Sequence, residues 1–185
     1  MLLVYGVIAA VILSLCTGGR PRHYLAHPLR GIGLPIAAFA LEALAPWAAK
    51  AISVPVWNWL WLPVCGQYLL LLAFCLMNIK RWPVWLVLLA TLMNFAVISL
   101  NGFRMPVSPE ALQMPALAET VARIQSGELF EYVIGNRSTP LLWLGDVIAL
   151  PFIPTGLASL GDLSLAAGVG GLVFQSMRPV REKAE

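Results

Sequence analysis

The chain has 185 residues, of which 59% are hydrophobic and 11% are charged, and its mean hydropathy is +0.81. Soluble domains are about 45–50% apolar and about 25% charged, so this composition excludes an ordinary soluble protein and indicates an integral membrane protein. The formal net charge is only +3, and the basic residues lie in short clusters at the ends of apolar segments. Such clusters are a membrane-topology signal, and they exclude nucleic acid as a partner.

Five apolar segments are predicted to be membrane-spanning helices, so the predicted fold is an all-α polytopic bundle in a single domain, residues 1–185. The spans are predicted at residues 1–17, 31–54, 58–79, 83–100 and 160–177, with an extracytoplasmic loop at 101–159. The first segment has neither the basic start nor the small-residue cleavage site of a secretory signal, and it is therefore predicted to be the first spanning helix.

The loop at residues 17–30 is basic and rich in Gly and Pro, which indicates a cytoplasmic position beside the lipid headgroups. His23 and His27 are four residues apart and would share one face of a helix, a spacing that also suits a metal or haem. Pro21 and Pro28 argue against a long helix here, so contact with headgroups is the preferred interpretation.

The second span carries one acid, Glu42, near its middle, and Pro46 is expected to distort the helix just beyond it. An isolated carboxylate in hydrocarbon is costly, so Glu42 should be protonated, paired or turned toward the bundle interior. Two interpretations stay open: a proton or cation site, and a hydrogen bond between helices.

The third and fourth spans, 58–79 and 83–100, are bounded by tryptophans that suit the two membrane interfaces. These are Trp57, Trp59 and Trp61 on the outer side and Trp82 and Trp85 on the inner side. Gln67 and Asn78 are interpreted as groups that hydrogen-bond between helices rather than as ligands.

The predicted outer loop, 101–159, contains two helix signals and one short apolar stretch. Ser108, followed by Pro and Glu, is typical of a helix N-terminus, and an amphipathic helix is predicted from Leu117 to a stop at Gly127. Residues 141–152 are apolar but too short to span, so they are predicted to be a re-entrant or buried segment.

The fifth span, 160–177, carries small residues four apart, which allow close contact with another helix. The pairs are Ala166 with Gly170 and Ala167 with Gly171. Basic residues are enriched on one side of the predicted topology, which favours an orientation with the N-terminus out and the C-terminus in. The inner set is Arg20, Arg22, Arg30, Lys80, Arg81, Arg178, Arg181 and Lys183; the outer set is Lys50, Arg104, Arg123 and Arg137.

On this topology Asn101, Arg104, Asp146 and Asp162 all fall near the outer interface and form the candidate polar site. Arg104 either pairs with an aspartate and latches the outer loop to the bundle, or helps to hold an anionic headgroup or small substrate. Asp146 or Asp162 would then act as acid, base or cation ligand. Ser159 and Asp162 also fit a capping box at the start of the fifth span, which alone could account for Asp162.

Two motifs carry a resemblance to a known family. They are Asn-Gly-x-Arg-Met-Pro-Val-Ser-Pro at 101–109 and Leu-Gly-Asp-Val-Ile at 144–148, followed by Ser-x-Gly-Asp at 159–162. The chain resembles, over nearly its full length, an uncharacterised bacterial membrane-protein family known only as a domain of unknown function. The resemblance implies a small five-helix inner-membrane protein, and a Gly where this chain has Phe103; it implies no reaction, cofactor or catalytic residue.

The sequence contains no phosphate-binding glycine loop, nucleophile–base pair or metal-ligand spacing, so no metal and no cofactor are expected, and whether the chain is an enzyme stays open. The preferred function is a non-catalytic accessory or scaffold subunit of a larger membrane complex, with membrane lipids and other membrane-protein subunits as partners. An alternative is an enzyme or binding protein for a lipid-linked or anionic substrate at the outer leaflet. A weaker alternative is a proton- or cation-coupled transporter that uses Glu42.

Overall fold

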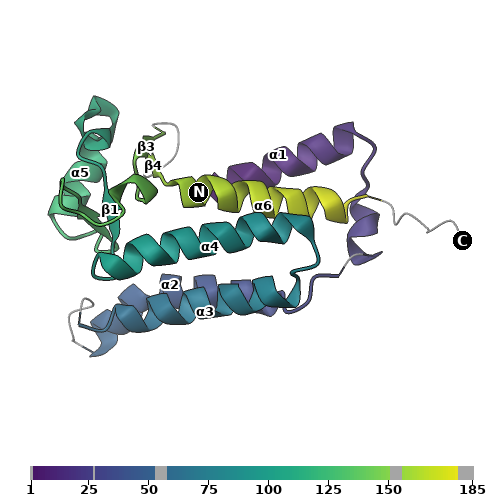
Figure 1. Ribbon diagram of the computed structural model, residues 1–185, viewed down its shortest axis with the longest axis horizontal. Helices are drawn as coiled ribbons and strands as arrows, with labels where there is room; N and C mark the ends of the chain where they lie inside the picture. Colours follow the sequence, from purple (N-terminus) through teal and green to yellow (C-terminus); the bar gives the residue numbers. More distant parts are fainter. Residues whose placement is uncertain (1, 27, 53–57, 151–155, 179–185) are drawn as a thin grey trace, which may run out of the picture.

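The structure is a computed structural model that describes residues 2–26, 28–52, 58–150 and 156–178, and it is mostly helical (Figure 1). Five long α-helices occupy the ranges predicted from the sequence. They are α1 (Leu2–Cys16), α2 (Gly33–Ile52), α3 (Trp61–Met77), α4 (Trp82–Leu100) and α6 (Leu160–Ser176). The helices form where apolar residues run without interruption, and they end where Gly, Pro and charged residues gather.

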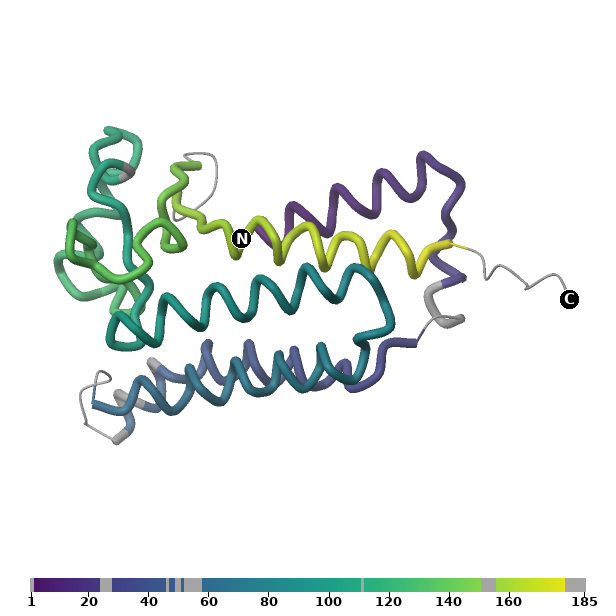
Figure 2. The backbone as a smooth tube through the Cα atoms, viewed as in Figure 1, coloured from purple at the N-terminus to yellow at the C-terminus, as the bar shows by residue number. Residues whose placement is uncertain are grey.

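The long helices lie side by side in a spatial order that differs from their order in the chain (Figures 1 and 2). Helix α2 packs on α3, α3 on α4, α4 on α6, and α6 on α1. The first and the last helix are therefore neighbours, and α6 is held between α4 and α1.

Small residues allow α6 to approach both of its neighbours closely. A Cβ atom on Gly168 would lie 2.8 Å from the backbone nitrogen of Val87 in α4, and one on Gly170 would lie 3.2 Å from the carbonyl oxygen of Gly6 in α1. Gly171 lies against Pro83 at the start of α4. Of the small residues predicted to give close helix contacts, Gly170 lies against α1 and Gly171 against α4. Gly168, which was not among them, also lies close to the backbone of α4.

One described helix, α4, is long and apolar enough to cross a membrane, with 19 residues and a hydropathy of 2.0 over its most apolar window. The segments Leu2–Cys16, Gly33–Ala45 and Trp61–Met77 are apolar helices of shorter length. The described residues thus form a bundle of helices, and one of these helices has the length and composition needed to cross a membrane.

The chain turns sharply at the end of α4. Gly102 and Phe103 both have positive φ, 66° and 61°, and the Phe103 amide donates to the carbonyl of Ile98 at 2.9 Å. A bulky residue in this left-handed region is uncommon and costs on the order of 1 kcal/mol. The turn therefore forms with Phe103 where the family resemblance implies glycine.

After this turn the chain builds a cap, which we define as the described part of residues 101–159. The cap contains two small sheets, and these correct the all-α prediction. Strand β1 (Met105–Val107) pairs in parallel with β2 (Tyr132–Ile134), and β3 (Ile148–Ala149) pairs antiparallel with β4 (Leu157–Ala158). Strands of two or three residues are too short to leave an alternating pattern in the sequence.

The apolar stretch predicted at 141–152 to be re-entrant or buried is partly buried in its described part, where residues 144–146 are buried. It forms a 3₁₀ turn at Leu142–Leu144 and then strand β3, while residues 151–152 lie outside the described residues. The helix predicted after Ser108 is also reduced to two 3₁₀ turns, Ala111–Gln113 and Pro115–Leu117. Prolines remove amide donors and so favour such interrupted turns over a continuous helix.

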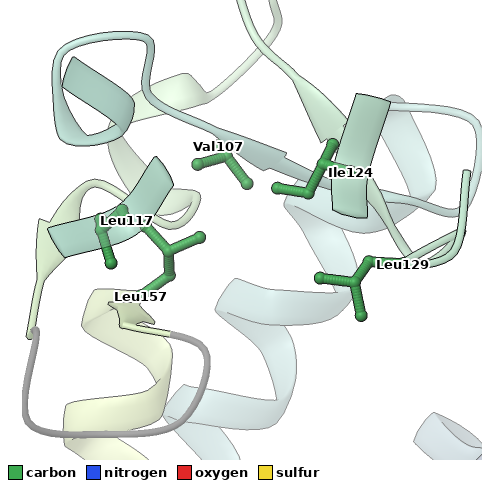
Figure 3. Packing of buried hydrophobic residues seen from close by; sticks show 5 residues of the cluster. All are labelled: Val107, Leu117, Ile124, Leu129 and Leu157. Atoms are coloured by element: carbon green, nitrogen blue, oxygen red, sulfur yellow. The ribbon is translucent and has the colours of Figure 1, made fainter. Parts of the chain in front are cut away.

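The predicted amphipathic helix is present as α5 (Ala118–Gln125), and the positive φ of Gly127, 77°, follows its end. Its buried face belongs to a hydrophobic cluster that gives the cap a core of its own, as Figure 3 shows. The cluster consists of Val107, Leu117, Ile124, Leu129 and Leu157. The cap is therefore a packed structure on one end of the bundle (Figure 1).

Candidate functional site

A cavity of about 830 Å³ lies where the helices meet the cap. Its lining comes from α1, α2, α3, α4 and α6 and from cap residues on β1, on β2 and after α5. Every long helix thus contributes to its wall, which makes it a feature of the whole bundle rather than a gap between two elements.

The charged groups in the lining are all acidic. The lining carboxyl groups belong to Glu42, Glu128, Glu131, Asp146 and Asp162, and no Lys or Arg is among the described lining residues. The remaining polar lining residues are Gln67, Tyr68, Thr91, Asn94 and Tyr132. Asp146 and Asp162 were predicted as site residues and Glu42 as an intramembrane acid, and the cavity brings these three together.

Glu42 lies on α2 and accepts a hydrogen bond of 2.9 Å from Nε2 of Gln67 on α3. The two open interpretations of Glu42 are therefore compatible, because the same carboxylate joins two helices and lines the cavity. Gln67 acts as an interhelical hydrogen-bonding group, as its sequence position indicated. Asn78, which was also predicted to bond between helices, instead joins the end of α3 to the loop before α2, because it bonds to both the amide and the carbonyl of Arg30.

Asp162 forms the predicted capping box at the start of α6. The Ser159 hydroxyl accepts from the Asp162 amide at 3.0 Å, and the Asp162 carboxylate accepts from the Ser159 amide at 3.0 Å. The other carboxylate oxygen accepts from Nδ2 of Asn94 in α4 at 3.2 Å. Asp162 is thus held in place by its own helix and by α4, with its carboxylate in the cavity wall.

Asp146 is the least exposed of the acids in the lining, at 3% exposure. Its backbone is fixed to β1, because its amide donates to the Pro106 carbonyl at 2.9 Å and its carbonyl accepts from the Ser108 amide at 3.1 Å. Its Oδ1 atom is buried and receives no hydrogen bond from any described residue. Burial raises the pKa of Asp146 to about 8, and the nearby Asp162 carboxylate adds to the increase.

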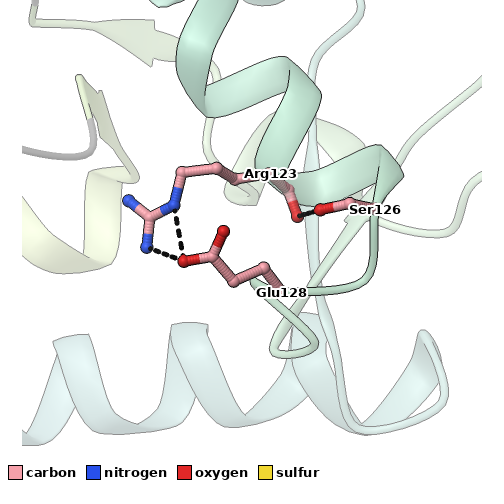
Figure 4. Close-up of polar contacts among 3 residues, drawn as sticks. All are labelled: Arg123, Ser126 and Glu128. Atoms are coloured by element: carbon pink, nitrogen blue, oxygen red, sulfur yellow. Dashed lines mark hydrogen bonds and ion pairs between the residues drawn. The ribbon is translucent and has the colours of Figure 1, made fainter.

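Two further acids of the cap were not predicted as site residues. Glu128 forms an ion pair with Arg123, with Nη2 and Oε1 2.9 Å apart, at the end of α5 (Figure 4). Glu131 lies just before β2, and burial raises its pKa above the usual value. Their place in the cavity wall depends on β1 pairing with β2, a contact between segments far apart in the sequence, so no local pattern could have indicated it.

Arg104 latches the cap, but not through an aspartate. Its guanidinium donates from Nε to the Phe130 carbonyl at 3.0 Å, and from Nη2 to the Tyr132 carbonyl. Asn101 donates from Nδ2 to the carbonyls of Val97 at 2.7 Å and Pro140 at 2.9 Å. Neither residue is part of the cavity lining, so the four predicted site residues divide into two that hold the cap and two that line the cavity.

The opposite end of the bundle carries basic residues that bond to backbone. Arg81 donates to the Pro28 carbonyl at 3.0 Å, and Arg178 donates to the Thr17 carbonyl at 2.8 Å. The Nδ1 atom of His23 lies 3.2 Å from the Met177 carbonyl oxygen, while His27 lies outside the described residues. No group of three His, Cys, Asp or Glu residues in the described part of the chain is arranged to hold a metal ion.

The fold and the cavity define the class of protein. It is a helical protein in which one described helix is long and apolar enough to cross a membrane, and a cavity lined by acidic residues lies between the helices and the cap. A family model described as a family of unknown function (DUF5317) matches residues 27–174. The chain belongs to this family. No curated protein and no solved structure matches it.

Proposed function

We propose that this protein is a bacterial inner-membrane protein with five spanning helices that binds a cationic ligand in the cavity under its cap. In this arrangement the cap and the N-terminus face outward, and the C-terminus faces the cytoplasm. The single observation that carries the proposal is the lining, which includes five acidic residues and no described Lys or Arg.

The distribution of charge along the bundle supports the membrane arrangement. All the described basic residues of the α1–α2 and α3–α4 connections and of the end of α6 lie at one end. The described acids lie in the cap, at the start of α6 or within α2. Short basic loops remain on the cytoplasmic side, so the cap belongs outside. Exposed tryptophans near both ends, such as Trp61 and Trp82, suit the two interfaces.

Electrostatics supports a cation as the ligand. A buried carboxyl group without a donor is costly, and an arriving positive charge would offset that cost more strongly than it would in water. Asp146 is such a group, since its Oδ1 atom is buried and without a hydrogen bond from the described residues. The number of acidic residues in the lining therefore favours a cation as the ligand. Asp146 favours it further, because its buried Oδ1 atom has no donor among the described residues.

The other predicted functions have less support from this geometry. An anionic or lipid-phosphate ligand would meet a wall of carboxyl groups, and Arg104, the cation proposed to hold it, donates to two carbonyls of the cap instead. The accessory-subunit role remains a prediction, whose test is co-purification of partner subunits with the intact protein. A transport role for Glu42 would also use the cavity, and it requires the same cation binding as its first step.

The test is a binding panel on the full-length protein in phosphatidylcholine nanodiscs, with empty nanodiscs as the blank. Ammonium, sodium and magnesium ions and benzyltrimethylammonium serve as cations, and inorganic phosphate serves as the anion. We expect saturable binding of at least one cation and none of phosphate. Binding of phosphate alone, or saturable binding of nothing in the panel, would overturn the proposal.

A further inference from the structure

We propose that the cationic ligand is an organic ammonium with an apolar body, and that its charged group binds beside Asp146. This inference rests on the proposed cation binding and names the chemical class of the ligand. It separates an organic cation from a metal ion, which would satisfy the same charge.

The first reason is the arrangement of the acids. A bare metal ion needs several oxygen ligands at about 2–2.6 Å, gathered around one point. Here the lining acids come from α2, from the stretch between α5 and β2, from the residue beside β1, and from the start of α6, and no described group of three is close enough for a metal. Acids spread around a large cavity favour a bulky cation, because each acts at a distance through the low-dielectric interior.

The second reason is the rest of the lining. The cavity volume of about 830 Å³ is in the range of small-molecule sites, and most of its wall is apolar or aromatic. The aromatic residues are Phe39, Tyr68, Phe103, Phe130 and Tyr132. Aromatic faces attract ammonium groups and also pack against hydrocarbon, so they suit both halves of such a ligand.

The third reason concerns where the ammonium group of the ligand binds, and it comes from the partners that the lining acids already have. Glu42 already accepts from Gln67, Asp162 accepts from Asn94 and Ser159, and Glu128 is paired with Arg123. Asp146 has a buried Oδ1 atom that receives no hydrogen bond from the described chain. Its neighbour in the wall, Tyr132, adds an aromatic ring from β2. The fifth lining acid, Glu131, is hydrogen-bonded to its own backbone and lies near Arg123 and Arg104. An ammonium group beside Asp146 would therefore meet a carboxyl group with an oxygen atom that no described donor occupies.

The test compares two ligands of the same shape. Benzyltrimethylammonium carries a quaternary nitrogen where neopentylbenzene carries a carbon, so the pair differs only in charge. In phosphatidylcholine nanodiscs at pH 8 we expect the ammonium to bind at least about tenfold more tightly than neopentylbenzene, after subtraction of empty nanodiscs. Equal binding of the two would overturn the inference, because the cavity would then be recognising shape alone.

Variants locate the charge. Asp146→Asn should weaken benzyltrimethylammonium binding about tenfold or more, whereas Glu119→Gln, which removes an exposed cap carboxyl outside the cavity, should change it less than about twofold. If Asp146→Asn fails to fold, the ligand pair on the unaltered protein still decides the question. Wild-type affinity in a folded Asp146→Asn variant would overturn the assignment to Asp146.

The outcomes also separate this inference from the broader proposal. Saturable binding of sodium or magnesium without binding of benzyltrimethylammonium would overturn the organic class and leave cation binding intact. Binding of phosphate alone, or of no cation, would overturn both.

Discussion

The carboxyl group of Asp146 is buried, and no described residue donates a hydrogen bond to its Oδ1 atom. Burial, with a smaller effect from the Asp162 carboxylate, raises its pKa to about 8. The groups that face it from the neighbouring elements are Tyr132 of β2 and Asp162 of α6, with Glu131 and Glu42 further along the same wall. None of these groups supplies a positive charge that would lower the pKa of Asp146.

The pKa of Asp146 predicts a pH dependence of stability. Because the folded-state pKa of about 8 lies above the ordinary value of 3.8, the folded protein holds a proton that the unfolded chain has lost at intermediate pH. Stability should therefore fall as pH rises from about 4 to about 8, by at most about 1.4 kcal/mol per pH unit, and this contribution should level off above pH 8.

Asp146→Asn removes this ionisation and isolates the effect. We expect the thermal midpoint of the variant minus that of the wild type to increase steadily from pH 5 to pH 8. This difference should then stay constant from pH 8 to pH 9. Circular dichroism of both proteins in one detergent would measure it. A difference between the two proteins that is flat across the whole range would contradict the assigned pKa.

Arg104 shows which part of a residue's role can be predicted from the sequence and which part cannot. Its place after the last turn of α4 left two interpretations open, a latch through an aspartate or a ligand for an anion, and it holds the cap without an aspartate. Its partners are backbone carbonyls of residues 130 and 132. They could not be predicted, because they come within reach only when β1 and β2 pair in parallel.

At the scale of the elements, the close contact between α4 and α6 depends on glycine at position 168, where a side chain would collide with α4. Gly168→Ala would place a Cβ atom 2.8 Å from the Val87 backbone nitrogen and 3.0 Å from Leu86 Cβ. Backbone cannot move aside as a flexible side chain can, so we expect a loss of about 1–3 kcal/mol in stability. Titration with sodium dodecyl sulfate, followed by circular dichroism, would show an earlier midpoint.

Gly33→Ala is the matched control, since a Cβ atom at this first residue of α2 would meet no atom within 4 Å. Its midpoint should equal that of the wild type or exceed it slightly, because Ala favours helix more than Gly does. If Gly168→Ala were as stable as Gly33→Ala, the close approach of α4 and α6 would be wrong.

The sequence allowed the helices to be predicted far better than the cap. Long apolar runs and the capping box formed by Ser159 and Asp162 depend on residues close together in the sequence. The helix ranges and the start of α6 could therefore be predicted. The strands of the cap have two or three residues each, and their pairing joins residues 105–107 with 132–134. The cavity acids on that side, Glu128 and Glu131, depend on the same non-local contact and were missed for that reason.

For the whole molecule, the larger number of basic residues in the loops and at the helix end opposite the cap predicts which compartment each end faces. In a cysteine-free background, a single cysteine at Glu119 in the cap should react with a membrane-impermeant maleimide in intact spheroplasts. A single cysteine at Lys80, between α3 and α4, should react only after the membrane is opened. Labelling of both positions in intact spheroplasts, or of Lys80 alone, would contradict the proposed orientation.

The placement of α1 against α6 also has a consequence for biogenesis. A nascent chain emerges from its N-terminus, so the Gly6 and Ala10 face of α1 is synthesised long before Gly170, the residue it packs against. Helices α2, α3 and α4 contact one another in chain order and can assemble as they leave the ribosome. Among the described elements, α6 is the main contact of α1, so the packing of α1 is completed only after α6 has been made. A ribosome stalled before residue 160 would therefore hold a chain in which α1 lacks its main packing partner.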